Sequence, residues 1–152
     1  MFQLVFFILF ASGLTELQEK ELLCKSADVE IFYSVCDPIS RSFFLGVEPC
    51  TYSGDWKLTF SWIPRGDINV LIAYVTIWHD ATTFLEWKYV ICSGSDDGYS
   101  FCGTLKGETV NTTMGASTST IKYLKGEYII LLKGRNAEEN LVVCMNYTLI
   151  IK

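Results

Sequence analysis

A single histidine, six cysteines and a scatter of acidic side chains are the groups with which this chain could do chemistry. His79 lies in "IWHDAT" at the end of an apolar run, and nothing beside it marks a nucleophile to activate. A lone histidine in this position is typical of a surface turn. Asp96 and Asp97 are neighbours, so their carboxylates diverge instead of sharing a reacting proton. We therefore expect a protein without enzymatic activity, and in particular not an esterase.

The sequence contains no motif for metal binding and only a three-residue motif for integrin binding. The cysteines form no Cys-x-x-Cys pair, and the acids around Asp97 lack the alternating spacing of a calcium loop. We expect no metal ion and no cofactor. The tripeptide Arg65-Gly66-Asp67 follows Pro64 and resembles an integrin ligand, but matches of three residues are common by chance.

The N-terminus predicts secretion. The run from Phe2 to Phe10 contains one polar residue, Gln3, and is shorter than the ~20 residues that cross a membrane. Small and then polar residues follow it, as at the cleavage site of a signal peptide. We expect a signal peptide over residues 1–16, one mature domain over residues 17–152, and a secreted, extracellular glycoprotein without a membrane span.

The cysteines and the charge are consistent with this route. An even number of cysteines in a secreted chain predicts three disulfides, formed by Cys24, Cys36, Cys50, Cys92, Cys102 and Cys144. Two Asn-x-Thr sequons, at Asn111 and Asn146, are acceptor sites for glycans. The formal net charge of −5 argues against a nucleic-acid partner, because phosphates need a concentrated basic face.

Short runs rich in β-branched and aromatic residues, separated by turn clusters such as "TYSGD" and "KGRNAEEN", predict an all-β fold. No long stretch combines a helical period with a convincing cap. We predict a single immunoglobulin-like sandwich of two antiparallel sheets. Its expected strands cover residues 28–35, 42–47, 57–63, 69–78, 83–91, 127–133 and 141–151.

Alternation in the last expected strand separates its two faces. A glycan on Asn146 must point to solvent, so the side chains at odd positions point inward, and they are all apolar or aromatic: Val143, Met145, Tyr147, Leu149 and Ile151. Cys144 then lies on the same outer face as the glycan. In the first expected strand the same alternation places Cys36 on the outer face. A Cys36–Cys144 disulfide is one reasonable pairing among the fifteen that six cysteines allow.

The aromatic content is high for so small a sandwich, with ten Phe, eight Tyr and four Trp. One explanation is a thick aromatic core, as in an adhesion module whose sheets close on each other. The other is a pair of sheets that stay apart around an apolar cavity, where each buried CH₂ of a ligand contributes ~0.8 kcal/mol. Composition leaves both explanations open.

Longer motifs favour the cavity. The hairpin "CSGSDDGYSFCGTLKGETVNTT", with "SADVEIFYSVCDPIS", "VEPC", "IPRGD", "IKYLKGEY" and "VCMNYTLII", resembles the ML lipid-recognition family, and within it the secreted co-receptors of Toll-like receptor 4. The resemblance covers nearly the whole chain and implies a lipid pocket between the sheets. Acyl chains of bacterial lipopolysaccharide (lipid A) would be held there and presented to the receptor in innate immune signalling. It also implies the disulfides Cys24–Cys50, Cys36–Cys144 and Cys92–Cys102.

A second branch of the family shares "CDP", "FCG" and the "GEY" strand. Its members are expected to carry phospholipid or sterol and to work with a different leucine-rich-repeat receptor. The segment "LKGETVNTT" favours the first branch.

The resemblance implies two sets of site residues. Lipid binding is expected at Ile31, Leu45, Val47, Leu58, Phe60, Val75, Phe101, Val110, Lys122, Tyr123, Lys125, Tyr128, Leu132, Val143, Met145, Tyr147 and Leu149. Receptor contact is expected at Arg65, Asp96, Asp97, Tyr99 and Lys106, whose polar character suits a salt-sensitive protein interface.

Several positions depart from the family pattern. The lid segment "MGASTST" places Ala116 and Thr118 where two phenylalanines are usual. Trp87 stands in place of a rim arginine, and Asp55 in place of a rim lysine. We expect lipid uptake to persist, because the pocket stays apolar. We expect lipid A affinity or agonist signalling to be weaker, because apolar lid area and phosphate-binding cations are lost.

Overall fold

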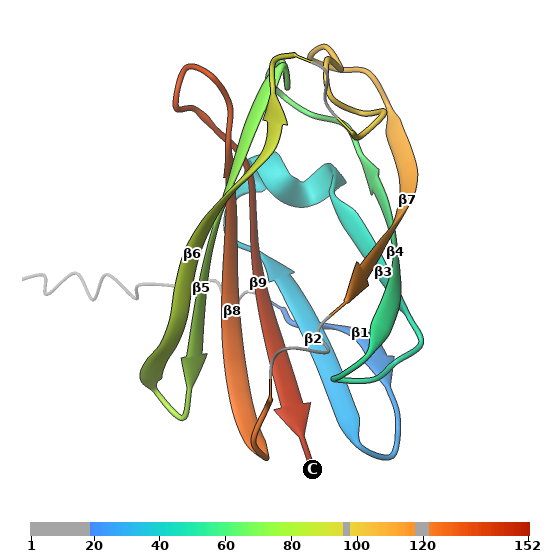
Figure 1. Ribbon diagram of the computed structural model, residues 1–152, viewed down its shortest axis with the longest axis vertical. Coiled ribbons are helices and arrows are strands. Elements are labelled where there is room, and N and C mark those ends of the chain that lie inside the picture. Colours follow the sequence, from blue (N-terminus) through green and yellow to red (C-terminus); the bar gives the residue numbers. More distant parts are fainter. Residues whose placement is uncertain (1–18, 96–97, 118–121) are drawn as a thin grey trace, which may run out of the picture.

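The protein forms a sandwich of two antiparallel β-sheets in a computed structural model that describes residues 19–95, 98–117 and 122–152. The larger sheet has six strands in the order β1-β2-β9-β8-β5-β6, and the smaller has three in the order β3-β4-β7 (Figure 1). This arrangement confirms the all-β, two-sheet prediction. The signal peptide expected over residues 1–16 lies outside the described residues.

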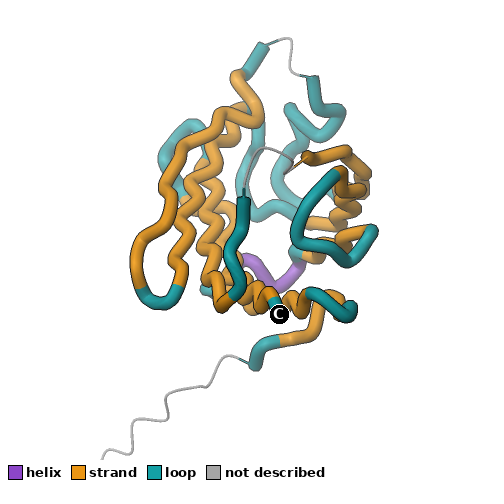
Figure 2. The backbone as a smooth tube through the Cα atoms, turned by 60° about the horizontal axis from the view of Figure 1, so that its bottom comes forward, coloured by secondary structure: helices purple, strands orange, loops and turns teal. Residues whose placement is uncertain are grey.

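The chain passes from sheet to sheet mostly in pairs of consecutive strands, with β7 as a single strand between two pairs. The larger sheet contains β1 (Glu21–Lys25), β2 (Val29–Val35), β5 (Val70–His79), β6 (Thr82–Ser93), β8 (Gly126–Arg135) and β9 (Leu141–Ile151). The smaller sheet contains β3 (Phe44–Glu48), β4 (Asp55–Trp62) and β7 (Val110–Ser117). A short 3-10 helix, η1 (Pro38–Ser42), carries the chain from the larger sheet to the smaller one (Figure 2, purple).

Two strands, β1 and β7, were not predicted from the sequence. The sequence of β7, "VNTTMGAS", is too polar to indicate a buried strand. It lies at the edge of the smaller sheet and pairs with β4, so one of its faces is solvated and can be polar. β1 is only five residues long and lies at an edge of the larger sheet.

β9 lies inside the larger sheet, between β2 and β8. Its five inward residues are all buried, with at most 7% of each exposed, which confirms the alternation predicted from the Asn146 sequon. The opposite face is less open than expected. Cys144 and Thr148 are also buried there, and the Asn146 side chain is half-buried with no hydrogen-bond partner for its Oδ1 among the described residues.

Three disulfides link the elements, and their pairing is the one that the family resemblance implied: Cys24–Cys50, Cys36–Cys144 and Cys92–Cys102. The first joins β1 of the larger sheet to the segment that follows β3 of the smaller sheet. The last closes a short loop after β6.

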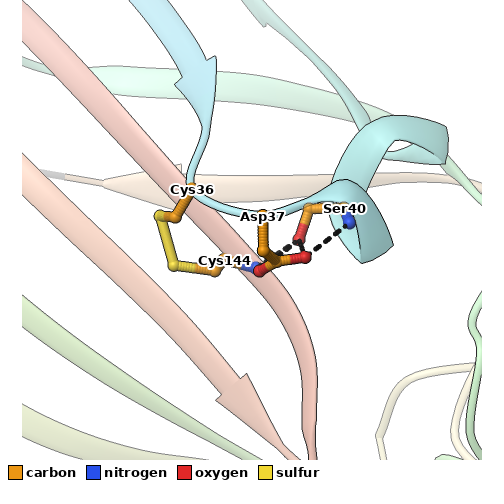
Figure 3. The surroundings of a disulfide bond; sticks show 4 residues. All are labelled: Cys36, Asp37, Ser40 and Cys144. Carbon is orange, nitrogen blue, oxygen red and sulfur yellow. Dashed lines mark hydrogen bonds between the residues drawn. A yellow bond between two sulfur atoms is a disulfide. The ribbon is translucent and has the colours of Figure 1, made fainter. Parts of the chain in front are cut away.

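The Cys36–Cys144 disulfide and η1 meet at the first half of β9. The disulfide joins the end of β2 to β9, next to η1 (Figure 3). The Cys144 main-chain N–H donates a 2.6 Å hydrogen bond to Ser40 Oγ, and the Ser40 N–H donates to Asp37 Oδ1 at 3.1 Å. η1 therefore lies beside β9 where β2 has ended, and its Ser40 accepts a main-chain hydrogen bond that no strand takes there.

The interior of the sandwich contains two core clusters. The first core cluster includes the buried residues Phe60, Trp62, Ile68, Leu71, Cys92, Phe101, Val110, Val142, Val143, Met145 and Tyr147. The second core cluster includes Val29, Ile31, Ile77, Tyr128, Leu149 and Ile151. Strands of both sheets supply the first cluster, whereas the buried residues of the second come from the larger sheet alone.

Candidate functional site

An apolar pocket of about 260 Å³ lies within the first core cluster. Both sheets and the segments that follow β2 and β6 contribute to its wall, which is formed by Phe43, Leu45, Leu58, Phe60, Trp62, Leu71, Ala73, Tyr89, Ile91, Tyr99, Phe101, Met114, Leu132, Gly134 and Val143. Of these described residues none is charged. The sheets thus stay apart around a cavity. This agrees with the second explanation for the aromatic content and not with a closed adhesion module.

Alternation on β4 and a glycine on β8 make room for the pocket. Leu58, Phe60 and Trp62 are two residues apart on β4, so all three point to the same side of the smaller sheet. On the opposite wall, a Cβ at Gly134 would lie 2.5 Å from Cγ1 of Val143. Only glycine fits this position without displacing Val143. No side chain from this position of β8 therefore enters the pocket.

Aromatic contacts hold one wall of the pocket in place. The ring centroids of Phe60 and Phe101 are 5.2 Å apart in an edge-to-face arrangement, and Phe43 stacks on Phe60 at 6.2 Å. Tyr99 stacks on Phe101 at 5.4 Å. Such pairs contribute roughly 0.5–1.5 kcal/mol each beyond the area they bury. The wall is therefore largely preformed, as ligand pockets usually are.

Two tyrosines form the polar part of the pocket wall. The side chains of Tyr89 and Tyr99 share a hydrogen bond, and this bond together with burial raises the pKa of Tyr99. Tyr89 is 53% exposed although it lines the pocket, so it marks where the pocket meets solvent. We call this place the pocket mouth. The mouth therefore carries two phenol hydroxyls, each of which can donate and accept a hydrogen bond.

Six of the residues expected to bind lipid line this pocket: Leu45, Leu58, Phe60, Phe101, Leu132 and Val143. Val110, Met145 and Tyr147 are buried in the first core cluster behind the wall. Burial raises the pKa of Tyr147, whose hydroxyl has no hydrogen-bond partner among the described residues. The expected lipid positions thus include residues that line the pocket and residues that pack around it.

Other expected lipid positions lie outside the pocket wall. Ile31, Tyr128 and Leu149 are buried in the second core cluster, and Val75 and Tyr123 pack against it. Burial is the main cause that raises the pKa of Tyr123. Val47 on β3 is half-buried, whereas Lys122 and Lys125 are exposed in the segment before β8. In this structure the pocket occupies one end of the space between the sheets, and the second cluster fills the other.

Nine residues of the wall were not among the expected lipid positions: Phe43, Trp62, Leu71, Ala73, Tyr89, Ile91, Tyr99, Met114 and Gly134. Alternation along the predicted strands could have found Trp62, two residues after Phe60, and Leu71 and Ala73, which are two apart on β5. No sequence signal distinguishes Met114, because β7 was not predicted as a strand.

The residues expected to contact the receptor are only partly brought together. Arg65 and Lys106 line a polar groove of about 530 Å³ with Asp67, Asn136 and Glu138, among others. The Lys106 main-chain N–H donates a 2.9 Å hydrogen bond to Asp67 Oδ1. The Arg-Gly-Asp tripeptide is thus part of this groove.

The other receptor and lid positions are placed as follows. Tyr99 lies at the pocket mouth instead of in the groove, and Asp96 and Asp97 lie outside the described residues. Ala116 is half-buried on β7, and Thr118 also lies outside the described part of the chain.

Neither metal binding nor a membrane span is indicated within residues 19–95, 98–117 and 122–152. No group of three or more His, Cys, Asp or Glu side chains in these ranges could hold a metal ion. No helix in the same ranges is long and apolar enough to cross a membrane. His79 instead stacks on Tyr128, with ring centroids 4.4 Å apart.

Solved structures with the same fold support the sandwich. Chicken MD-1, solved in complex with lipid IVa, superimposes with a TM-score of 0.78 over 88% of this chain and 98% of its own, at 22% identity. A Niemann-Pick type C2 protein from the Japanese carpenter ant gives a TM-score of 0.50 over 86% of this chain and 96% of its own, at 16% identity. At these identities the likeness shows the fold alone.

Sequence comparisons show the family. No family model matches the chain. Lymphocyte antigen 96 of human and of cattle are each 37% identical to it over 150 residues, which is 97% of this chain and 94% of each relative. Mouse lymphocyte antigen 86 is 29% identical over 131 residues, covering 85% of this chain and 80% of the relative. With this identity over nearly the full length of both proteins, the chain belongs to the lymphocyte antigen 96 (myeloid differentiation factor 2) family.

Proposed function

We propose that this chain is a secreted, non-enzymatic co-receptor that holds acyl chains of bacterial lipopolysaccharide (lipid A) between its sheets and presents them to Toll-like receptor 4. The observation that carries the proposal is the uncharged, aromatic-walled pocket between the two sheets. Chicken MD-1, which has the same fold, was solved in complex with lipid IVa. Membership of the lymphocyte antigen 96 family supports the receptor half of the proposal.

The pocket would bind acyl chains through the hydrophobic effect. Each CH₂ that leaves water contributes ~0.8 kcal/mol, and a preformed wall loses little entropy when the chain enters. The expected positions that would touch the first chain are Leu45, Leu58, Phe60, Phe101, Leu132 and Val143. For lipid to reach the remaining positions, the second core cluster would have to open, because Tyr128 and Leu149 are buried there.

The polar groove would supply part of the receptor contact. Arg65 and Lys106 lie on its wall beside acidic Asp67 and Glu138, so it offers both signs of charge to a partner. Such surfaces speed association and weaken as salt rises. In this proposal Asp96, Asp97 and Tyr99 extend the contact, with Tyr99 linking the receptor face to the pocket mouth.

Secretion and processing belong to the same proposal. Three disulfides are typical of proteins that fold in an oxidising compartment. A signal peptide over residues 1–16 would be removed, and glycans would be added at Asn111, which is exposed on β7, and at Asn146. The protein would then be extracellular, and at the cell surface when bound to its receptor.

A pull-down from a secretory host tests the proposal. The full chain is expressed with a purification tag at its C-terminus, and lipids extracted from the purified protein are identified by mass spectrometry. We expect lipid with acyl chains to co-purify, and added lipid A to displace it. We also expect the Toll-like receptor 4 ectodomain to be captured, and Arg65→Ala with Lys106→Ala to reduce capture. A protein that carries no lipid and captures no receptor would refute the proposal.

A second candidate is a phospholipid or sterol carrier that works with another leucine-rich-repeat receptor. The 29% identity to mouse lymphocyte antigen 86 is the observation that supports it. Phospholipid or sterol in the purified protein, without displacement by lipid A and without capture of Toll-like receptor 4, would support this candidate over the first.

A further inference from the structure

Two exposed aromatic side chains on β6 continue the wall of the pocket. Residues directly opposite each other in an antiparallel pair share one face of the sheet, and β6 places Trp87 opposite Val75 and Tyr89 opposite Ala73. Ala73 lies in the pocket wall, so Tyr89 and Trp87 point to the inner side of the larger sheet. Even so, Trp87 is 40% exposed and Tyr89 is 53% exposed. Their rings lie on the inner side of the sheet, next to the pocket and outside the core.

The two rings and the pocket mouth form one continuous surface. Side chains two residues apart on a strand lie ~7 Å apart on the same face. Tyr89 belongs to the pocket wall, and its side chain shares a hydrogen bond with Tyr99. β6 is the edge strand of the larger sheet (Figure 1). A ligand that leaves the pocket past Tyr89 along this edge therefore meets Trp87 next.

The charged side chains of this part of β6 point to the other face. Glu86 and Lys88 alternate with Trp87 and Tyr89, and the Lys88 ammonium lies 5.5 Å from the ring of Tyr74 on the outer side. A phosphate over the two rings would lose water without gaining a cation from these residues. An uncharged sugar ring loses less. Its C–H face packs on an aromatic ring, and its hydroxyls can bond to the phenol and indole polar groups.

We propose that Trp87 and Tyr89 form a platform for the uncharged sugar headgroup of a glycolipid whose acyl chains occupy the pocket. The proposal rests on the proposed function in one respect, the entry of acyl chains into the pocket. Rings on the inner side of the sheet face the contents of the pocket, which favours a headgroup over a bilayer as their partner. At these two positions the mouth offers ring faces and hydrogen-bonding groups, and the neighbouring cation, Lys88, lies on the other face of the sheet.

Binding of three lipids with identical acyl chains tests the platform. Glucosyl diacylglycerol, diacylglycerol and phosphatidic acid each displace a fluorescent fatty acid from the secreted, full-length protein. We expect the glucosyl lipid to bind about 3- to 10-fold more tightly than diacylglycerol, which is the effect of one or two aromatic contacts. Trp87→Ala should abolish this difference and leave diacylglycerol affinity within about twofold. Tyr74→Phe, a matched change on the outer face, should alter neither affinity.

A gain-of-function variant makes the result independent of folding defects. Trp87→Arg should reverse the preference, so that phosphatidic acid binds more tightly than the glucosyl lipid. Equal affinity of the unmodified protein for glucosyl lipid and diacylglycerol would overturn the platform and leave the lipid pocket standing. An equal loss for all three lipids in Trp87→Ala would also overturn it, as would binding to intact vesicles through Trp87 without lipid uptake. Failure to bind any of the three lipids would overturn the proposed function together with this inference.

Discussion

Filling the pocket from its wall should abolish lipid binding without unfolding the protein. Ala73 is the best position, because its side chain lines the pocket between Gly134 on β8 and Tyr89 on β6. A phenylalanine there would project over the glycine into the cavity of about 260 Å³ instead of into a packed neighbour. Its ring adds about six carbon atoms, so it excludes about as many CH₂ groups of an acyl chain. At ~0.8 kcal/mol each, the loss is roughly 5 kcal/mol, or more than a thousandfold in affinity.

Displacement of a fluorescent fatty acid measures this loss, and thermal unfolding monitors the fold. We expect Ala73→Phe to bind no detectable lipid and to keep a melting temperature near that of the unmodified protein, because the new ring fills an existing space. Thr76→Phe adds the same ring to the outer face of β5 and serves as the matched control. Unchanged lipid affinity in a folded Ala73→Phe protein would show that lipid does not use this pocket.

Three further results are expected. Ala116→Phe should restore apolar area at the lid, on the order of 60–100 Å², and raise lipid A-driven receptor dimerisation at least about tenfold; full dimerisation by the unmodified protein would contradict this. Hydrogen bonds from Lys152 and Lys25 lower the pKa of the Glu30 carboxyl from 4.5 to about 2. The ionised Glu30 therefore stabilises the fold fully above about pH 4.5, and this stabilisation is lost as the pH falls toward 2. Melting curves of Glu30→Gln should therefore show a smaller drop in stability over that range. Replacing the Cys36–Cys144 disulfide by two alanines, which opens a loop with a sequence separation of 108, should lower the free energy of unfolding by about 4.8 kcal/mol in urea titrations.

The sequence predicts the fold well because the strands that form the core have a clear pattern. The inward residues of β9 alternate strictly, and the neighbouring sequon identifies the outer face independently. β7 escapes prediction for a physical reason. An edge strand with one solvated face needs few large apolar residues, so Asn111, Thr112 and Thr113 look like a loop.

The site is less predictable, because alternation says which side chains point inward and not how far apart the sheets lie. Phe60 and Leu149 are both inward positions, yet one lines the pocket and the other fills the second core cluster. Tyr89 and Trp87 are harder still. They follow the inward pattern of β6 but remain exposed. The smaller sheet has three strands and the larger has six, so residues on the edge strand β6 can face inward without being covered.

The place of β9 in the larger sheet also determines when this protein can fold during synthesis. Of the described strands it is the last to leave the ribosome, and both β2 and β8 pair with it. A nascent chain that ends before residue 141 leaves those two strands with unpaired edges, and Cys36 without its disulfide partner. The Cys24–Cys50 and Cys92–Cys102 bonds can form earlier, because each lies within a short stretch of chain. Of the three bonds, Cys36–Cys144 is therefore expected to form last, and protein disulfide isomerase has until then to correct early mispairing.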